Sequence, residues 1–311
     1  MRRATLAACF TVTAALAACG GGSSMPADDV PTIDAPTATI DAPDGWATLL
    51  QGSWSLNPGE EAYFCVYATV PADVDIKAFR PIIPLGTHHT VLTRYSGSAP
   101  DGTVRCSVGT NGQSMIYGSG VGSPDFVFPA GVGMRLTAGT RLLLNLHLYN
   151  AGDQVLTGTS GTLYQQAAPG EVQHVGEVVL AGPTATLQVP PGTSTQSGTC
   201  NISSITSTPI QVFALSQHMH KHGRNLRSVV RRAGSPDIVL QDIPYNFEQQ
   251  SFQLKTPVVE LRPGDVLTSY CTYDNTSGQT VRFGESTDDE MCFTDLFYYP
   301  AQGANFVCSG F

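Results

Sequence analysis

A leucine-rich segment in the middle of the chain indicates the kind of fold. Residues 141–148 read Arg-Leu-Leu-Leu-Asn-Leu-His-Leu, a run that is hydrophobic enough to form a central β-strand. Similar short runs, such as Tyr63–Ala68 and Pro209–Leu215, recur between Gly, Pro, Asn and Asp residues. No stretch carries an apolar stripe of helical period over three turns. The pattern predicts an all-β chain of sandwiches or jelly rolls.

The composition excludes several classes of protein. Only 13% of the 311 residues are charged, which disfavours a helical bundle or a coiled coil. The net charge of -9 and the absence of any Lys/Arg run argue against nucleic acid as a partner. Motifs typical of serine hydrolases, nucleotide-binding proteins and zinc peptidases are also missing from the sequence.

The length and the local composition predict the domain organisation. At about 150 residues per domain, the chain is long enough for two domains. Residues 19–45 are rich in Gly, Pro and Asp and predict a flexible, disordered tether. Pro169-Gly170 marks a join, so we expect an N-terminal domain over residues 46–170 and a C-terminal domain over residues 171–311.

The first residues predict export from the cytosol. Two arginines precede the apolar stretch Leu6–Leu16, which is too short to span a bilayer. The small residues that follow resemble a bacterial lipoprotein signal, with residues 1–18 as the signal peptide and Cys19 as the lipidated residue. An ordinary secretory peptide is the alternative. Gly20 favours a lipid anchor in the outer membrane, on its periplasmic or cell-surface face.

Five of the seven histidines fall in two tight groups, and the second reads His218-Met219-His220-Lys221-His222. Side chains alternate along a strand, so His218 and His220 would project on one side and could bind one metal ion. A solvated polar strand end is the alternative. His222 would share that face only if the strand continued, and Gly223 suggests that it ends there.

The first group is His88-His89. Adjacent residues point to opposite faces of a regular strand, so joint metal binding requires a strand end or a bend. Pro84 and Gly86, just upstream, make such a break credible. His147 lies in the leucine-rich segment, where a histidine by itself is more often a hydrogen-bonded core group than a ligand.

A further signal is the acidic run Asp288-Asp289-Glu290, followed by Met291. The run lacks the alternate spacing and the glycine turn of a calcium loop. Met291 on its own is most simply a core residue.

The cysteine count supports an exported protein stabilised by disulfides. Cys9 and Cys19 belong to the signal region, which leaves Cys65, Cys106, Cys200, Cys271, Cys292 and Cys308. Six cysteines in an oxidising compartment indicate three disulfides, and spacing alone leaves all 15 possible pairings open.

Four short motifs, taken in chain order, resemble the copper type II, ascorbate-dependent monooxygenases, the family of peptidylglycine α-hydroxylating and dopamine β-monooxygenases. They are Thr87–Leu92, Leu144–Tyr149, His218–His220 and Asp288–Cys292. The resemblance covers essentially the whole chain after the tether, and it implies two consecutive antiparallel β-sandwich, jelly-roll-like domains. It also implies one mononuclear copper site in each domain, the two facing each other across a solvent-filled cleft.

The resemblance assigns ligands to both implied copper sites. The ligands of an electron-transfer copper would be His88, His89 and His147. The ligands of the catalytic copper, where oxygen is activated, would be His218, His220 and Met291. Imidazoles suit copper, and a thioether is a soft ligand that favours Cu(I).

The resemblance also implies a pairing of the cysteines. Cys65 would pair with Cys106, Cys271 with Cys292, and Cys200 with Cys308. The second of these bonds would hold the residue next to Met291 and so limit the movement of its sulfur.

The sequence departs from the peptide-amidating members of the family at three positions. In those enzymes an Arg, an Asn and a Tyr anchor the carboxylate of the peptide, and the aligned residues here are Ser216, Phe293 and Asp295. None of them is a guanidinium, and Asp295 would repel a carboxylate. An apolar or amine substrate is compatible with these residues.

The sequence as a whole therefore predicts a lipid-anchored copper monooxygenase that hydroxylates a C–H bond of a small organic substrate. It would use O₂ and an external one-electron donor, either ascorbate or another reductant. The alternative is a non-enzymatic copper-binding or storage lipoprotein at the cell surface, which the loss of the carboxylate-anchoring residues would fit.

Overall fold

A computed structural model describes residues 40–107, 114–247, 252–303 and 307–309. The described residues belong to one compact unit that spans Ala35–Phe311. The predicted signal peptide, Cys19 and most of the tether lie outside the described residues. In the described part, no helix is both long and apolar enough to cross a membrane.

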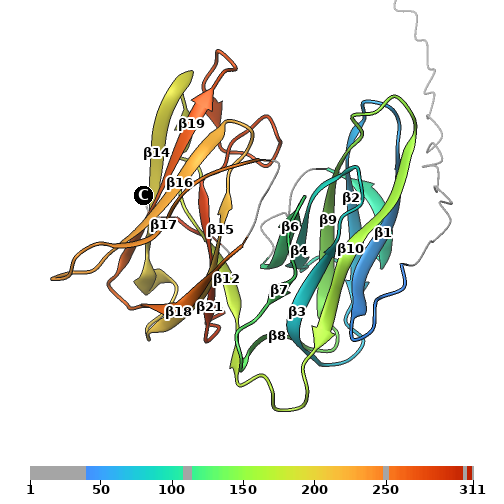
Figure 1. Ribbon diagram of the computed structural model, residues 1–311, viewed down its shortest axis with the longest axis horizontal. Helices are drawn as coiled ribbons and strands as arrows, with labels where there is room; N and C mark the ends of the chain where they lie inside the picture. The colour runs from blue at the N-terminus through green and yellow to red at the C-terminus, as the bar shows by residue number, and fades with distance from the viewer. Residues whose placement is uncertain (1–39, 108–113, 248–251, 304–306, 310–311) are drawn as a thin grey trace, which may run out of the picture. The chain divides into compact units, whose positions relative to one another are not determined.

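Two sheets are built mainly from the first part of the chain (Figure 1). The leucine-rich segment is β9, the central strand of a five-stranded sheet, where it pairs with β2 on one side and β4 on the other. The order in this sheet is β5 (Gly102–Cys106), β2 (Glu61–Thr69), β9 (Arg141–Tyr149), β4 (Thr87–Arg94) and β6 (Met115–Gly120). The order in the second sheet is β1 (Ala47–Leu56), β10 (Leu156–Gln166), β3 (Val74–Ile82), β8 (Val132–Leu136) and β11 (His174–Val175), with β7 (Phe126–Val127) beside β3.

The later strands form two larger sheets and a small one. One sheet has the order β18 (Gln253–Leu261), β15 (Ile210–His218), β21 (Phe293–Tyr299), β12 (Glu177–Ala181) and β22 (Val307–Cys308). The other has the order β14 (Gly192–Asn201), β19 (Val266–Asn275), β16 (Gly223–Arg231) and β17 (Ile238–Pro244). A short pair joins β13 (Gln188–Val189) to β20 (Val281–Arg282), and a 3-10 helix covers Ile202–Ser204. The predicted all-β, antiparallel fold class is confirmed, whereas the domain boundary at residue 170 stays a prediction.

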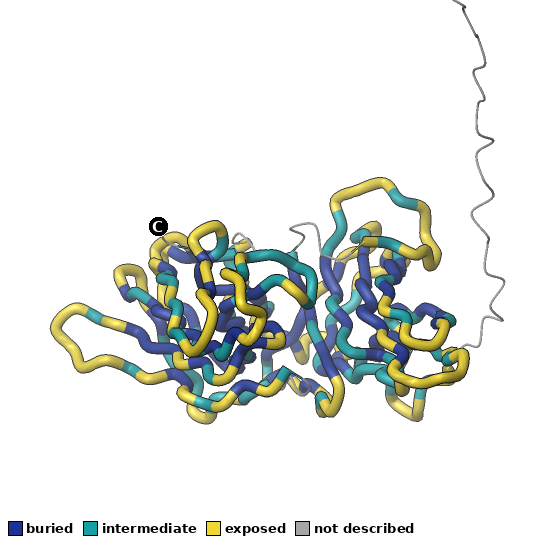
Figure 2. Tube along the Cα trace, turned by 90° about the horizontal axis from the view of Figure 1, so that it is seen from above, coloured by how far each residue is buried: buried dark blue, intermediate teal, exposed yellow. Residues whose placement is uncertain are grey.

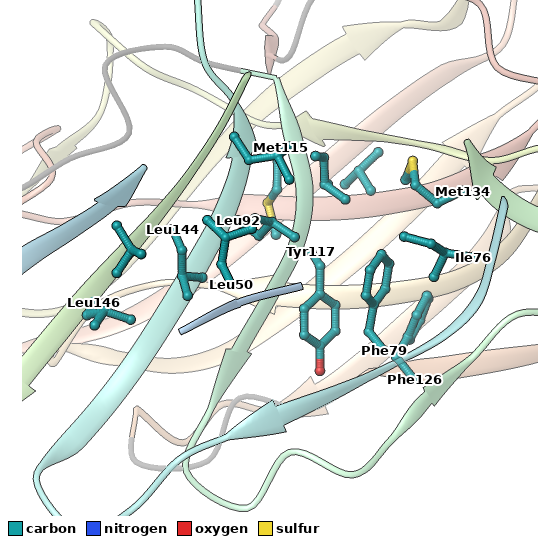
Figure 3. Close-up of a cluster of buried hydrophobic side chains, with 14 of the residues drawn as sticks. Leu50, Ile76, Phe79, Leu92, Met115, Tyr117, Phe126, Met134, Leu144 and Leu146 are labelled. Carbon is teal, nitrogen blue, oxygen red and sulfur yellow. The ribbon is translucent and has the colours of Figure 1, made fainter. Parts of the chain in front are cut away.

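The core follows from the alternation of side chains along the strands. Leu142, Leu144, Leu146 and Leu148 of β9 each expose 1% or less of their surface and enter one large hydrophobic cluster. Figure 3 shows Leu144 and Leu146 in this cluster, and Figure 2 shows exposed residues mainly in the outer loops of the trace. The cluster also takes in Phe213 of β15 and other side chains from β12 and β21, so residues on both sides of Gly170 share it.

Three disulfides join the pairs that the resemblance implies: Cys65–Cys106, Cys200–Cys308 and Cys271–Cys292. The second of these closes a loop with a sequence separation of 108. The third ties β19 to the residue that precedes β21. Each bond restricts the unfolded chain and thereby stabilises the folded one.

Candidate metal centre

Adjacent strands bring the first group of histidines together. His147 of β9 is the cross-strand partner of His89 in β4. The register of this pair of strands shifts between Thr87 and His89. Such a bulge turns two successive side chains towards one side. The predicted bend is therefore present, and His88 contributes to the same cluster as His89 and His147.

The three imidazoles converge through their Nδ1 atoms. His89 Nδ1 lies 3.0 Å from His88 Nδ1 and 3.4 Å from His147 Nδ1. One ligand atom from each of the three residues can be chosen so that all lie within 4.8 Å of one another. Three imidazole nitrogens this close together could hold a single metal ion.

Burial keeps these imidazoles neutral, which metal binding requires. It lowers the pKa of His88 to about 4 and lowers the pKa of His89 well below its usual value. The pKa of His147 is also lowered by burial, although the carboxylate of Glu61 opposes that shift. His88 Nε2 is buried and has no hydrogen-bond partner among the described residues. Three neutral imidazole ligands suit copper, so the residues present fit the group that the resemblance implies.

The second group of histidines is arranged differently from our prediction. We expected His218 and His220 to lie on one face of a continuous strand, but β15 ends at His218. His220 belongs to the connection to β16, which begins at Gly223. The two rings nevertheless lie near each other, with centroids 5.4 Å apart and an interplanar angle of 86°. The connection, and not strand alternation, brings them together.

His220 is held in one orientation by the acidic run. Its Nδ1–H donates to the carbonyl of Asp289 over 3.0 Å, which leaves Nε2 as the atom available to a metal. Burial lowers the pKa of His220 to about 3, so this imidazole is neutral as well. The acidic run Asp288-Asp289-Glu290, which lacks the pattern of a calcium loop, thus provides a backbone carbonyl that orients a histidine.

Glu290 stands out in the sequence only as part of the acidic run, and its contacts in the structure give it a specific role. Its fully buried carboxylate accepts the backbone N–H of His220 over 2.9 Å and the backbone N–H of His222 over 2.8 Å. Burial raises the pKa of Glu290 to about 7 against the effect of these hydrogen bonds. Glu290, which directly precedes Met291, therefore fixes the turn that carries His220 and His222.

Met291 follows directly in the chain, two residues before β21 begins. Its carbonyl accepts from the Tyr273 hydroxyl over 2.6 Å, and its neighbour Cys292 is held by the disulfide to Cys271. The backbone of Met291 is thus fixed on both sides. Its partly buried side chain packs against the main hydrophobic cluster.

His222 lies beyond the two other histidines of its group. It is 5% exposed, and its Nε2 has no partner among the described residues. Burial lowers the pKa of its imidazole. The described contacts of its backbone are with Glu290 and with the N–H of Asp274.

The three positions that anchor a carboxylate in the peptide-amidating enzymes lie on β15 and β21. The cross-strand partners are Ser216 with Asp295 and His218 with Phe293, so Phe293 and Asp295 share the face of His218. The Ser216 hydroxyl donates to Asp295 Oδ2 over 2.6 Å, whereas Asp295 Oδ1 is buried without a partner among the described residues. Burial raises the pKa of Asp295 to about 7, so its repulsion of a carboxylate weakens below neutral pH.

Residues beside the two histidine groups contact each other. Thr287 Oγ1 donates to Glu61 Oε1 over 3.1 Å, and the His88 ring lies 4.4 Å from the ring of Phe247. Burial is the main cause of the lowered pKa of His89, and proximity to the other imidazoles, including those of His218 and His220, lowers this pKa further. The solvent-filled cleft between the sites, which the resemblance implies, stays a prediction.

Comparisons with known proteins identify a related family over the second half of the chain. Residues 175–310 match the model of the copper type II ascorbate-dependent monooxygenase family, C-terminal domain. This C-terminal part of the chain, residues 175–310, belongs to the family.

Three relatives show how far the likeness extends. Putative DBH-like monooxygenase protein 2 of Homo sapiens is 29% identical over 248 residues, which are 72% of this chain and 49% of that protein. Dopamine beta-hydroxylase of Bos taurus is 26% identical over 309 residues, or 89% of this chain and 48% of that protein. Tyramine beta-hydroxylase of Caenorhabditis briggsae is 37% identical over 94 residues, or 30% of this chain and 16% of that protein. The chain thus matches about half the length of these relatives, or less.

Proposed function

We propose that the protein is a copper-dependent monooxygenase that hydroxylates a C–H bond of a small organic substrate. One oxygen atom of O₂ would enter the C–H bond and the other would leave as water. The reaction also consumes two electrons and two protons, with the electrons supplied by ascorbate or another external one-electron donor. The observation that carries the proposal is the convergence of three neutral imidazoles through Nδ1 in a chain whose C-terminal part belongs to this family.

The proposal places one copper ion at each group of residues. His88, His89 and His147 would hold the electron-transfer copper. His218, His220 and Met291 would hold the catalytic copper, and the soft thioether would favour its reduced state. Bound copper would supply one-electron chemistry and the activation of O₂.

The chain's own residues would orient these groups and the substrate. Asp289 holds the His220 ring with Nε2 free, and Glu290 fixes the turn that carries it. Phe293 and Asp295 lie on the face of His218, where they offer an apolar ring and a buried carboxyl group to a substrate. This combination supports an apolar or amine substrate over a peptide carboxylate.

A copper-storage protein is less well supported, because the chain matches a family of monooxygenases. We further propose that the protein is exported and lipid-anchored at Cys19, in agreement with the pairing of all six remaining cysteines. An outer-membrane location, on either face, is part of the same proposal.

The direct test is Met291→Ala. We expect reductant-dependent formation of hydroxylated product from a panel of amine, phenolic and apolar compounds to fall by at least about 100-fold, since a lost transition-state contact of a few kcal/mol has that effect. Met134→Ala is the matched control, because Met134 is a buried methionine of β8 and is neither a proposed ligand nor a sequence neighbour of one. Unchanged product formation by Met291→Ala would exclude the assignment of this ligand.

A further inference from the structure

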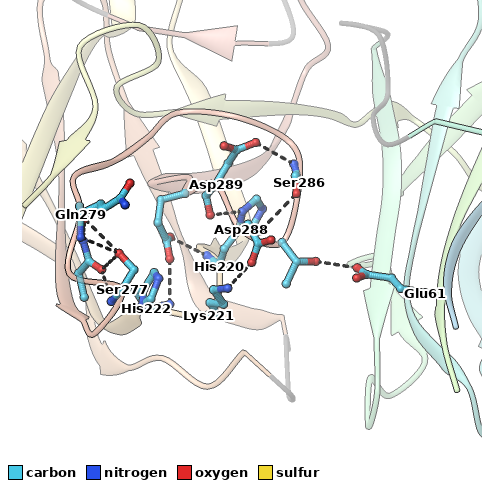
Figure 4. A network of polar contacts seen from close by, with 12 residues as sticks. Glu61, His220, Lys221, His222, Ser277, Gln279, Ser286, Asp288 and Asp289 are labelled. Carbon is cyan, nitrogen blue, oxygen red and sulfur yellow. Dashed lines mark hydrogen bonds and ion pairs between the residues drawn. The ribbon is translucent and has the colours of Figure 1, made fainter. Parts of the chain in front are cut away.

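Glu61 touches both halves of the proposed centre, although neither the sequence motifs nor the ligand assignment includes it. It is the first residue of β2. Its Oε1 atom accepts from His147 Nε2 over 2.6 Å and from Thr287 Oγ1 over 3.1 Å. Figure 4 shows Glu61 at the end of the polar network that contains His220 and Asp288.

The bond to His147 determines which nitrogen of that ring faces the other histidines. When Nε2–H donates to the carboxylate, Nδ1 carries the lone pair, and Nδ1 is the atom directed at His89. The Tyr63 ring stacks on the His147 ring, with the two ring centroids 4.5 Å apart and an interplanar angle of 8°. Glu61 thus fixes the tautomer of His147, while Tyr63 fixes the plane of its ring.

The bond to Thr287 reaches the segment that serves the second group. Thr287 lies in the turn before Asp289, whose carbonyl accepts from His220. The next residue is Glu290, which binds the backbone of the histidine turn and precedes Met291. A displacement of Thr287 would therefore move the residues that position His220 and Met291.

We propose that Glu61 is a positioning residue shared by both sites, which orients His147 in the first and ties the segment carrying Met291 to it through Thr287. This inference rests on the proposed function, since it takes the two groups as copper sites. A carboxylate behind a metal-binding histidine raises the basicity of the ring and holds its orientation. The double acceptor role of Oε1 makes the position of one site depend on that of the other.

The first arm of the test uses Glu61→Ala, with Glu61→Gln as a milder variant that keeps an acceptor oxygen. In the metal-free protein, ¹⁵N NMR of the histidine rings should show His147 protonated at Nε2 in the wild type and a mixture of tautomers in Glu61→Ala. Competition with a Cu(I) chelator should show about 10- to 100-fold weaker binding at the first site. Glu60→Ala is the control, because Glu60 is the neighbouring carboxylate and binds Arg105 and Asn57 instead.

The second arm uses Thr287→Val, which removes the hydroxyl and keeps the shape of the side chain. We expect the tautomer of His147 and the affinity of the first site to stay as in the wild type. Hydrogen exchange at the amides of His220 and His222 should become several-fold faster, because their acceptor Glu290 lies in the released segment.

The outcomes separate this inference from the proposed function. An unchanged tautomer and an unchanged copper affinity in Glu61→Ala would overturn the role at His147. Unchanged amide exchange in Thr287→Val would overturn the link between the sites. A wild type that binds no copper would refute the proposed function, while the tautomer measurement would still test what Glu61 does to His147.

Discussion

At the scale of single residues, the least expected group is the carboxyl of Asp295. It is 4% exposed, it receives one hydrogen bond from Ser216, and its other oxygen has no partner among the described residues. Natural proteins seldom bury such an oxygen without a reason, because desolvation is costly. Its position on the face of His218 supplies a reason if the carboxyl group contacts substrate.

The raised pKa of Asp295 predicts how stability depends on pH. The pKa is about 7 in the folded chain against an ordinary value of 3.8, so the folded state holds its proton more tightly. Stability should therefore fall as pH rises from about 4 to 7, and Asp295→Asn should remove this loss. Between pH 4 and pH 8, the free energy of unfolding of the variant should rise relative to that of the wild type by up to about 4 kcal/mol, at about 1.4 kcal/mol per pKa unit. Urea unfolding at the two pH values measures the gain, and an equal difference at both would contradict the assignment.

At the scale of elements, the second site depends on two connections between strands. One runs from β15 to β16, and the other runs from β20 to β21. The Glu290 side chain holds the backbone N–H groups of His220 and His222, and the carbonyl of His222 accepts from the N–H of Asp274 in β19. The disulfide between Cys271 and Cys292 then fixes the other side of Met291. A carboxylate and a covalent bond thus hold the site in addition to the backbone contact with β19.

The corresponding prediction concerns Glu290→Ala. It would leave two buried backbone N–H groups without an acceptor, at about 1–3 kcal/mol each, so we expect a loss of roughly 2–5 kcal/mol in the free energy of unfolding. Asp288→Ala in the same turn is the control. Asp288 is exposed and pairs with Lys221, and such a surface ion pair contributes at most about 1 kcal/mol. Equal losses in the two variants, measured by urea unfolding, would show that Glu290 has no special role.

The sequence predicted the strands better than the connections. The period-two leucines of β9 and the bend at His88 are local patterns, and both are present in the structure. The end of β15 at His218 was not predictable, because it depends on what the turn contacts elsewhere. The roles of Glu61 and Glu290 were not predictable for a similar reason: their partners lie 86 and 68–70 residues away along the chain.

At the scale of the whole molecule, the sites rest on a core that both parts of the chain build. The Phe126 ring of β7 lies 5.0 Å from Phe297 of β21 and 6.2 Å from Phe213 of β15. Contacts between aromatic rings at these distances add to the burial of apolar surface. Together with the bond between Glu61 and Thr287, they place the two histidine groups within one connected structure.

The central claim is that this structure holds two copper ions, one at each group of histidines. The most direct test is the copper content of the purified protein after reconstitution and removal of loosely bound metal. We predict two copper ions per chain in the wild type and about one in His147→Ala, since that variant removes a ligand of the first site only. A wild-type protein that retains no copper would contradict this claim. A His147→Ala variant that retains as much copper as the wild type would contradict it as well.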